Sequence, residues 1–192
     1  DKNGAVISSI NQENGLNNNT VDAMFEDIDN NLWLALDNGI SVINFNAPFS
    51  VYNDLKGKLG SVYASAIFND QLYLGTNQGL FYKNVNSEED FKFINNTYGQ
   101  VWCLKVIDNT LFCGHNSGTF IVNNDSVELV SSILGTWDIK AIKNKNLLFQ
   151  GNYNGLSVLE KKAGKWQFRN RLKGYSISSR FFEFKNEKEL FV

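Results

Sequence analysis

One short phrase recurs along the chain at a period of about forty residues, and it constrains the fold more than any other feature. It consists of Leu, an aromatic residue, two or three small or polar residues, and a closing Gly. Self-similarity at a fixed period of this length indicates one repeated supersecondary unit. Full copies occupy residues 32–39, 72–79, 111–118 and 148–155, and a fifth begins at Leu190.

Each repeat is predicted to contain four short strands joined by turns. In the first copy, residues 21–25 alternate between apolar and polar side chains, as expected of a half-buried strand, and residues 32–36 form the second strand. The Asn-Gly pair that follows tolerates positive φ and is a strong hairpin signal, so a third strand is expected at 40–45. A fourth strand is expected at 49–52, and no window shows sustained helical spacing.

Four antiparallel strands in every repeat, with an aromatic residue in the second strand, are typical of a β-propeller blade. One such sheet has two apolar faces and covers neither alone. Radial stacking buries both faces, with second-strand aromatics such as Trp33 filling the wedge between neighbours. We therefore predict an all-β fold, a β-propeller of four-stranded antiparallel blades. The predicted blades span residues 20–53, 61–94, 100–130 and 136–170, with partial blades at 1–10 and 177–192.

The chain is expected to be an excerpt of a larger ring. It stops within a repeat whose earlier copies each continue to a Gly, and it begins part-way through another, whereas domain boundaries usually fall in polar linkers. A partial propeller of about four full blades is therefore expected. The alternative is closure as five blades, in which a strand at 5–10 completes the sheet begun by residues 181–192.

Composition argues against two classes of partner. The formal net charge is −2 and the Lys and Arg residues are scattered, whereas nucleic-acid binding needs them clustered, so no direct nucleic-acid contact is expected. No apolar run approaches the roughly 18 residues of a membrane span. Membrane contact is therefore expected only through a segment beyond the end of this sequence.

No catalytic site, metal site or cofactor is expected. Asp27, Asp29 and Asn31 mimic the first half of a calcium loop, but the required Gly and the closing Glu are missing, so a turn is favoured. Asp22 and Asp138 are candidate paired carboxylates for glycoside hydrolysis, yet nothing in the sequence positions them as acid and base. No phosphate loop or nucleophile motif is present in the sequence.

Two cysteines flank one predicted hairpin turn. With a two-residue turn, Cys103 and Cys113 fall on opposite faces of the ribbon, and a shift of one residue would place them opposite each other. Buried free thiols are the favoured interpretation. Together with His115 they lack the spacing of a zinc site.

Strand order predicts which residues share one rim of the propeller. The hairpins between second and third strands should lie on the same rim as the starts of the first strands, near the central channel. Aromatic, amide and charged groups that converge there suit a polar ligand with flat apolar faces, such as a carbohydrate. The competing interpretation is packing for the aromatics and solvated turn chemistry for the tips, His115 included. The candidate ligand-binding residues are Asp22, Tyr63, Trp102, Trp137 and Arg180 from the strand starts, and Asn77, His115, Asn116 and Tyr153 from the tips.

Three segments resemble a known repeat family. Residues 26–35 are similar to the "eDxdGnlWiGT" signature of the two-component regulator propeller repeat, and residues 12–21 resemble the "dGLpsNxV" phrase before it, with Asn17 where proline is usual. Residues 72–80 match the "lWiGTxxGl" half, and the later copies keep mainly the aromatic and the glycines. The resemblance implies the periplasmic sensor domain of a bacterial hybrid two-component or one-component regulator, with about seven blades.

The resemblance also implies what surrounds such a domain. An immunoglobulin-like module often follows, then a membrane helix and a histidine kinase or a DNA-binding regulator. The expected function is extracytoplasmic sensing of a small polar ligand, such as an oligosaccharide, on the loop rim, and the expected partners are that ligand, the rest of the same receptor chain and a second copy in a homodimer. The alternatives are a protein-interaction or receptor-dimerisation platform without a small ligand, and a propeller glycosidase.

Overall fold

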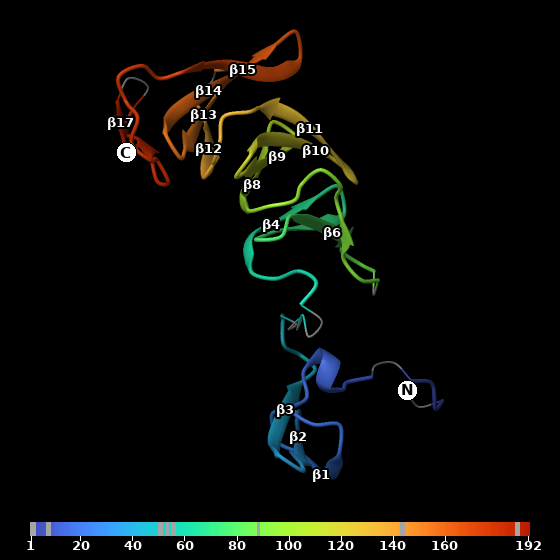
Figure 1. Ribbon diagram of the computed structural model, residues 1–192. Helices are drawn as coiled ribbons and strands as arrows, with labels where there is room; N and C mark the ends of the chain where they lie inside the picture. Colours follow the sequence, from blue (N-terminus) through green and yellow to red (C-terminus); the bar gives the residue numbers. More distant parts are fainter. Residues whose placement is uncertain are drawn as a thin grey trace. The chain divides into compact units, whose positions relative to one another are not determined.

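The computed structural model describes residues 3–6, 9–49, 52, 54, 57–87, 89–142, 145–186 and 189–192 (Figure 1). The chain divides into two units, Asp1–Lys58 and Leu59–Val192. Apart from one short 3-10 helix, η1 (Gln12–Asn14), the regular elements in these described ranges are β-strands. None of the described residues forms a helix long and apolar enough to cross a membrane.

The first unit contains one antiparallel sheet, here named blade 1. Its strands pair in the order β1 (Val21–Glu26), β2 (Asn31–Leu36) and β3 (Gly39–Asn44). Leu34 and Leu36 point to one face, where they pack with Leu16 in a small core. The fourth strand expected at 49–52 and the strand expected at 5–10 both include residues outside the described part of the chain.

Trp33 lies outside the small core of the first unit. The residue lies between Leu34 and Leu32 on the alternating strand β2, so its side chain points away from the face that buries Leu34. The indole remains 42% exposed. Its Nε1 donates a hydrogen bond to Asp27 Oδ2 at 2.8 Å, so Trp33 organises the preceding turn.

The second unit contains three four-stranded sheets, each a meander whose strands pair in chain order, and one two-stranded sheet. The four-stranded sheets are named blades 2, 3 and 4 here. Blade 2 comprises β4 (Val62–Phe68), β5 (Gln71–Thr76), β6 (Leu80–Asn84) and β7 (Lys92–Phe93). Blade 3 comprises β8 (Val101–Ile107), β9 (Thr110–His115), β10 (Gly118–Asn123) and β11 (Ser126–Ser131). Blade 4 comprises β12 (Asp138–Ala141), β13 (Leu147–Asn152), β14 (Gly155–Lys162) and β15 (Lys165–Arg171), and in the two-stranded sheet β16 (Glu183–Phe184) pairs with β17 (Leu190–Phe191).

Apolar cores lie between successive sheets of this unit. One cluster joins blade 2 to blade 3 and includes Tyr73 and Leu111, and the next joins blade 3 to blade 4 and includes Phe112 and Leu148. Tyr73 and Phe112 are second-strand aromatics and both are fully buried. The second-strand aromatics of blades 2 and 3 therefore occupy the space between neighbouring blades, as predicted.

The first glycine of the repeat marks the contact between blades. A Cβ added to Gly75, Gly114 or Gly151 would come within 3.0 Å of the following chain, at Val101, Thr136 and Ser179 respectively. These glycines adopt ordinary φ values, so their requirement is space rather than backbone conformation. Each marks a second strand against which the next part of the ring lies closely.

The two cysteines fall on opposite faces of blade 3, because Cys103 pairs with Gly114 and Leu104 pairs with Cys113. Cys103 contributes to the core shared with blade 4, and Cys113 to the core shared with blade 2. Burial raises the pKa of the Cys103 thiol to about 12 and that of Cys113 well above its usual value. Both residues are free, buried thiols held in the neutral form.

A buried polar network links blades 3 and 4 beside their apolar core. Gln150 Nε2 donates to Thr119 Oγ1 at 2.6 Å, and Thr119 Oγ1 lies 2.8 Å from Thr136 Oγ1. Asn152 Nδ2 donates to Thr136 Oγ1 at 3.1 Å, while the Ser157 hydroxyl lies 2.6 Å from Asn152 Oδ1 and 3.1 Å from Gln150 Oε1. All five residues are buried. Since each polar group has a partner across or within the blades, the network fixes their relative position.

Candidate functional site

β-Bulges position two of the candidate aromatic residues. The pairing of β4 with β5 shifts register between Val62 and Ala64, and the pairing of β8 with β9 shifts between Val101 and Cys103. Tyr63 and Trp102 are the extra residues in these bulges, so neither has a cross-strand partner. A bulge re-aims the side chain of its extra residue, and this places both rings at the same end of their blades.

Four aromatic side chains of the second unit lie together, and we name them the aromatic rim: Tyr63, Trp102, Trp137 and Tyr153. The rings of Tyr63 and Trp102 stack with centroids 5.2 Å apart, and those of Trp102 and Trp137 are 4.4 Å apart. Tyr153 lies 5.1 Å from Trp137, and its hydroxyl accepts a hydrogen bond from Trp102 Nε1 at 2.9 Å. The rim therefore continues across blades 2, 3 and 4.

Arg180 extends this surface with a cation. Its guanidinium lies 5.1 Å from the centroid of Trp137 and 5.4 Å from that of Phe181. A cavity of about 340 Å³ lies among Tyr63, Trp102, Trp137 and Arg180. The arrangement presents flat apolar faces beside a charged hydrogen-bond donor, which is the chemistry of a site for a polar ring-shaped ligand.

Charged residues of the innermost strands line the same cavity. Lys105 and Asp138 belong to the lining, and Lys105 Nζ lies 3.0 Å from Asp138 Oδ1. Lys140 Nζ lies 3.7 Å from the other oxygen of Asp138 and also pairs with Glu183, so Asp138 lies beside two lysines and Lys140 beside two carboxylates. The sequence prediction missed Lys105 as a site residue. The available signal was a charged side chain within an otherwise apolar first strand.

His115, a candidate ligand-binding residue, is not the solvated turn residue of the competing interpretation. It is 1% exposed because β9 continues through it, pairing with Val101 and Gly118. Its Nδ1 lies 2.7 Å from Ser117 Oγ and its Nε2 lies 3.2 Å from the carbonyl oxygen of Thr97. Burial lowers the pKa of His115, and the bond to Thr97 only partly offsets that effect. With both ring nitrogens occupied inside the protein, His115 is not part of the aromatic rim.

The remaining candidates lie at other places. Asn77 is an exposed tip residue whose Oδ1 accepts a hydrogen bond from the Ser61 backbone at 2.8 Å. Asn116 is half-buried, and its Oδ1 is buried without a hydrogen-bond partner among the described residues. Asp22 belongs to the first unit, where it is exposed at the bulge of β1. The structure thus brings together Tyr63, Trp102, Trp137, Tyr153 and Arg180 within the second unit.

The calcium-like sequence forms a turn organised by Asp27. Its carboxylate accepts hydrogen bonds from Trp33 Nε1 at 2.8 Å and from the Asn31 backbone and side chain at 2.9 and 3.0 Å. The Trp33 bond is the main reason that the pKa of Asp27 falls to about 2. Across the described ranges, no three His, Cys, Asp or Glu side chains gather as metal ligands.

The sheets and their rim define a β-propeller of four-stranded antiparallel blades, and the predicted fold class is confirmed. Residues 15–38 match the family model described as two component regulator propeller. The matched range overlaps the segments 12–21 and 26–35 that resemble the repeat family, so the resemblance is confirmed over residues 15–38. No curated protein is significantly similar to the chain.

Two solved structures from B. thetaiotaomicron are similar to this chain, each an extracellular domain described as part of a hybrid two component system. The BT3049 domain shows 20% identity and a TM-score of 0.53 over 91% of this chain and 26% of its own. The BT4673 domain shows 20% identity and a TM-score of 0.51 over 84% of this chain and 24% of its own. The present chain therefore spans about a quarter of each domain, and at this identity the similarity concerns the fold.

Proposed function

We propose that this chain is part of the extracytoplasmic sensor domain of a bacterial membrane-bound signalling protein, and that its aromatic rim binds a small polar ligand of the oligosaccharide class. The single observation that carries the proposal is the continuous aromatic surface from Tyr63 through Trp102 to Trp137. The repeat at residues 15–38 and the extracellular domains of similar fold support the sensory role. We further propose that the output, a kinase or a DNA-binding module, lies elsewhere in the full protein and that this region is not itself catalytic.

The rim chemistry matches the two surfaces of a sugar ring. Pyranose faces carry C–H groups that pack against indole and phenol rings, and their edges carry hydroxyls that need donors and acceptors. Trp137 and Arg180 present an aromatic ring and a guanidinium side by side, and Arg180 Cζ lies 5.1 Å from the centroid of the Trp137 ring. Successive rings on successive blades suit an extended ligand with several sugar units. Binding would signal through a difference in affinity between two arrangements of the receptor.

The test is calorimetric titration of the chain with a panel of purified neutral and acidic oligosaccharides. We expect at least one to bind, and Trp102→Ala to weaken that affinity about tenfold or more without unfolding the chain. Tyr98→Ala is the matched control, because Tyr98 is an exposed aromatic that packs on Phe93, not on the rim. Unchanged affinity in Trp102→Ala would count against the assignment. Failure of the whole panel, with a polypeptide captured through Trp102 instead, would favour the interaction-platform alternative.

A further inference from the structure

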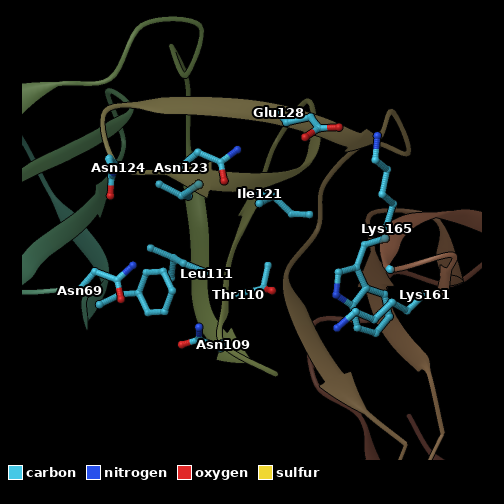
Figure 2. Close-up of a pocket in the computed structure, with 14 residues that line it drawn as sticks. Asn69, Asn109, Thr110, Leu111, Ile121, Asn123, Asn124, Glu128, Lys161 and Lys165 are labelled. Carbon is cyan, nitrogen blue, oxygen red and sulfur yellow. The ribbon is translucent and has the colours of Figure 1, made fainter.

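A second cavity, of about 430 Å³, lies at the other end of the strands (Figure 2). The aromatic rim lies at the end of the blades where first strands begin and second strands end, whereas this cavity is built by the turns between β4 and β5, β8 and β9, and β10 and β11. The hairpin joining β14 to β15 closes it. Residues of blades 2, 3 and 4 thus contribute to one concavity within the second unit.

Amide side chains surround one part of this cavity. Asn69, Asn109 and Asn124 occupy turn positions with φ of 49°, 53° and 53°, a conformation that Asn tolerates better than most residues. Turn geometry therefore explains why Asn is present, and the amides also line the cavity. Figure 2 shows Asn69 and Asn124 on the side of the cavity opposite Lys161 and Lys165.

Cationic and N–H groups dominate the other part. Lys161 and Lys165 both line the cavity, against a single carboxylate, Glu128. Trp166, also in the lining, is 8% exposed, and its buried Nε1 has no hydrogen-bond partner among the described residues. Lys161 Nζ lies 5.6 Å from the centroid of the Trp166 ring. A buried N–H without an acceptor is uncommon and points to a missing partner.

Apolar side chains form the rest of the surface, including Phe68, Leu111 and Val122. The volume falls within the range of small-molecule sites, and the lining combines an apolar floor with a few polar groups, as such sites do. The lining contains more lysines than carboxylates, so its local charge is positive, whereas the formal net charge of the chain is −2. Local charge of opposite sign to the whole protein favours an anionic ligand.

We propose that this cavity binds a small hydroxylated organic anion, whose carboxylate or phosphate group is attracted by the charges of Lys161 and Lys165 and whose hydroxyls are held by the asparagine amides. Lysine binds such groups as a point charge, and a charged partner makes the hydrogen bond stronger than a neutral one. This site is separate from the aromatic rim and does not depend on its ligand.

The experiment titrates the chain with glucuronate, glucose 6-phosphate and glucose, using tryptophan fluorescence and calorimetry at low salt. Binding of glucuronate alone identifies a carboxylate site, binding of glucose 6-phosphate alone identifies a phosphate site, and glucose is the uncharged match. We expect one or both anions to bind with a dissociation constant below about 10 mM, to bind more weakly at high salt, and glucose not to bind.

Variants locate the binding. Lys161→Gln combined with Lys165→Gln should weaken anion binding about tenfold or more, while Lys173→Gln, an exposed lysine outside the lining, should leave it unchanged. Trp102→Ala should also leave it unchanged, which separates this site from the rim. Equal binding of glucose, no anion binding at about 10 mM, or full binding by the double lysine variant would each overturn the proposal.

Discussion

The buried network between blades 3 and 4 allows the stacking of blades to be measured as an energy. Thr119 lies in β10 of blade 3 and Gln150 in β13 of blade 4, and the 2.6 Å hydrogen bond between them crosses the blade boundary. Thr119→Val and Gln150→Leu remove the polar atoms while largely keeping the volume. A double-mutant cycle on this pair therefore isolates one contact between blades.

The magnitude follows from the bonds that each variant loses. Gln150→Leu loses the bonds to Thr119 and Ser157, and Thr119→Val loses those to Gln150 and Thr136. At about 1 kcal/mol per buried hydrogen bond, each single variant should lower the free energy of unfolding by about 2 kcal/mol. The shared bond is lost in both, so the coupling free energy should be about 1 kcal/mol.

Urea unfolding, followed by tryptophan fluorescence, measures the free energy of unfolding of the unsubstituted protein, the two single variants and the double variant. The matched control is Gln167→Leu, which removes an exposed bond to Glu160 within blade 4 and should change the free energy of unfolding by less than about 0.5 kcal/mol. A coupling free energy below about 0.3 kcal/mol would refute the stacking of these two blades through this network.

Three further outcomes are expected. Gly151→Ala should destabilise the protein by about 1–3 kcal/mol in thermal unfolding, because its Cβ would collide with the backbone of Ser179; an unchanged melting temperature would contradict this close approach. His115 is the only histidine in the sequence and burial lowers its pKa from 6.5, so the unfolded state takes up its proton first as pH falls. Stability should therefore be full above about pH 6.5 and decline below it, and His115→Asn should flatten that decline between about pH 7.5 and 5.5. Trp33→Phe should raise the pKa of Asp27 from about 2 toward 3.8, which a carboxyl NMR titration would show, and an unmoved pKa would exclude Trp33 as its main cause.

The period of the repeat was enough to predict the strands, because hydrophobic alternation and turn residues are local signals. It also predicted that Tyr73 and Phe112 would be buried between blades. His115 differs from the solvated-turn interpretation because its slot, the last residue of the second strand, is buried in every full copy: Leu36 is 6% exposed, and Thr76 and Asn152 are fully buried.

The candidate rim was predicted in part. Strand order placed Tyr63, Trp102 and Trp137 on one rim, where they contact one another. The bulges that re-aim Tyr63 and Trp102 were not predictable, because register depends on pairing with the next strand. The second cavity was missed because its asparagines have a sufficient explanation as turn residues, and its lysines lie in another blade.

The most direct test of the rim as a ligand surface uses the indole N–H signals of the four tryptophans in a nitrogen–proton NMR spectrum, each assigned by substitution. Trp102 and Trp137 lie in the aromatic rim, Trp33 belongs to the first unit, and Trp166 lines the second cavity. Titration with the oligosaccharide that binds should shift the signals of Trp102 and Trp137 and leave those of Trp33 and Trp166 in place. An oligosaccharide that binds while the Trp102 and Trp137 signals stay fixed would contradict the account.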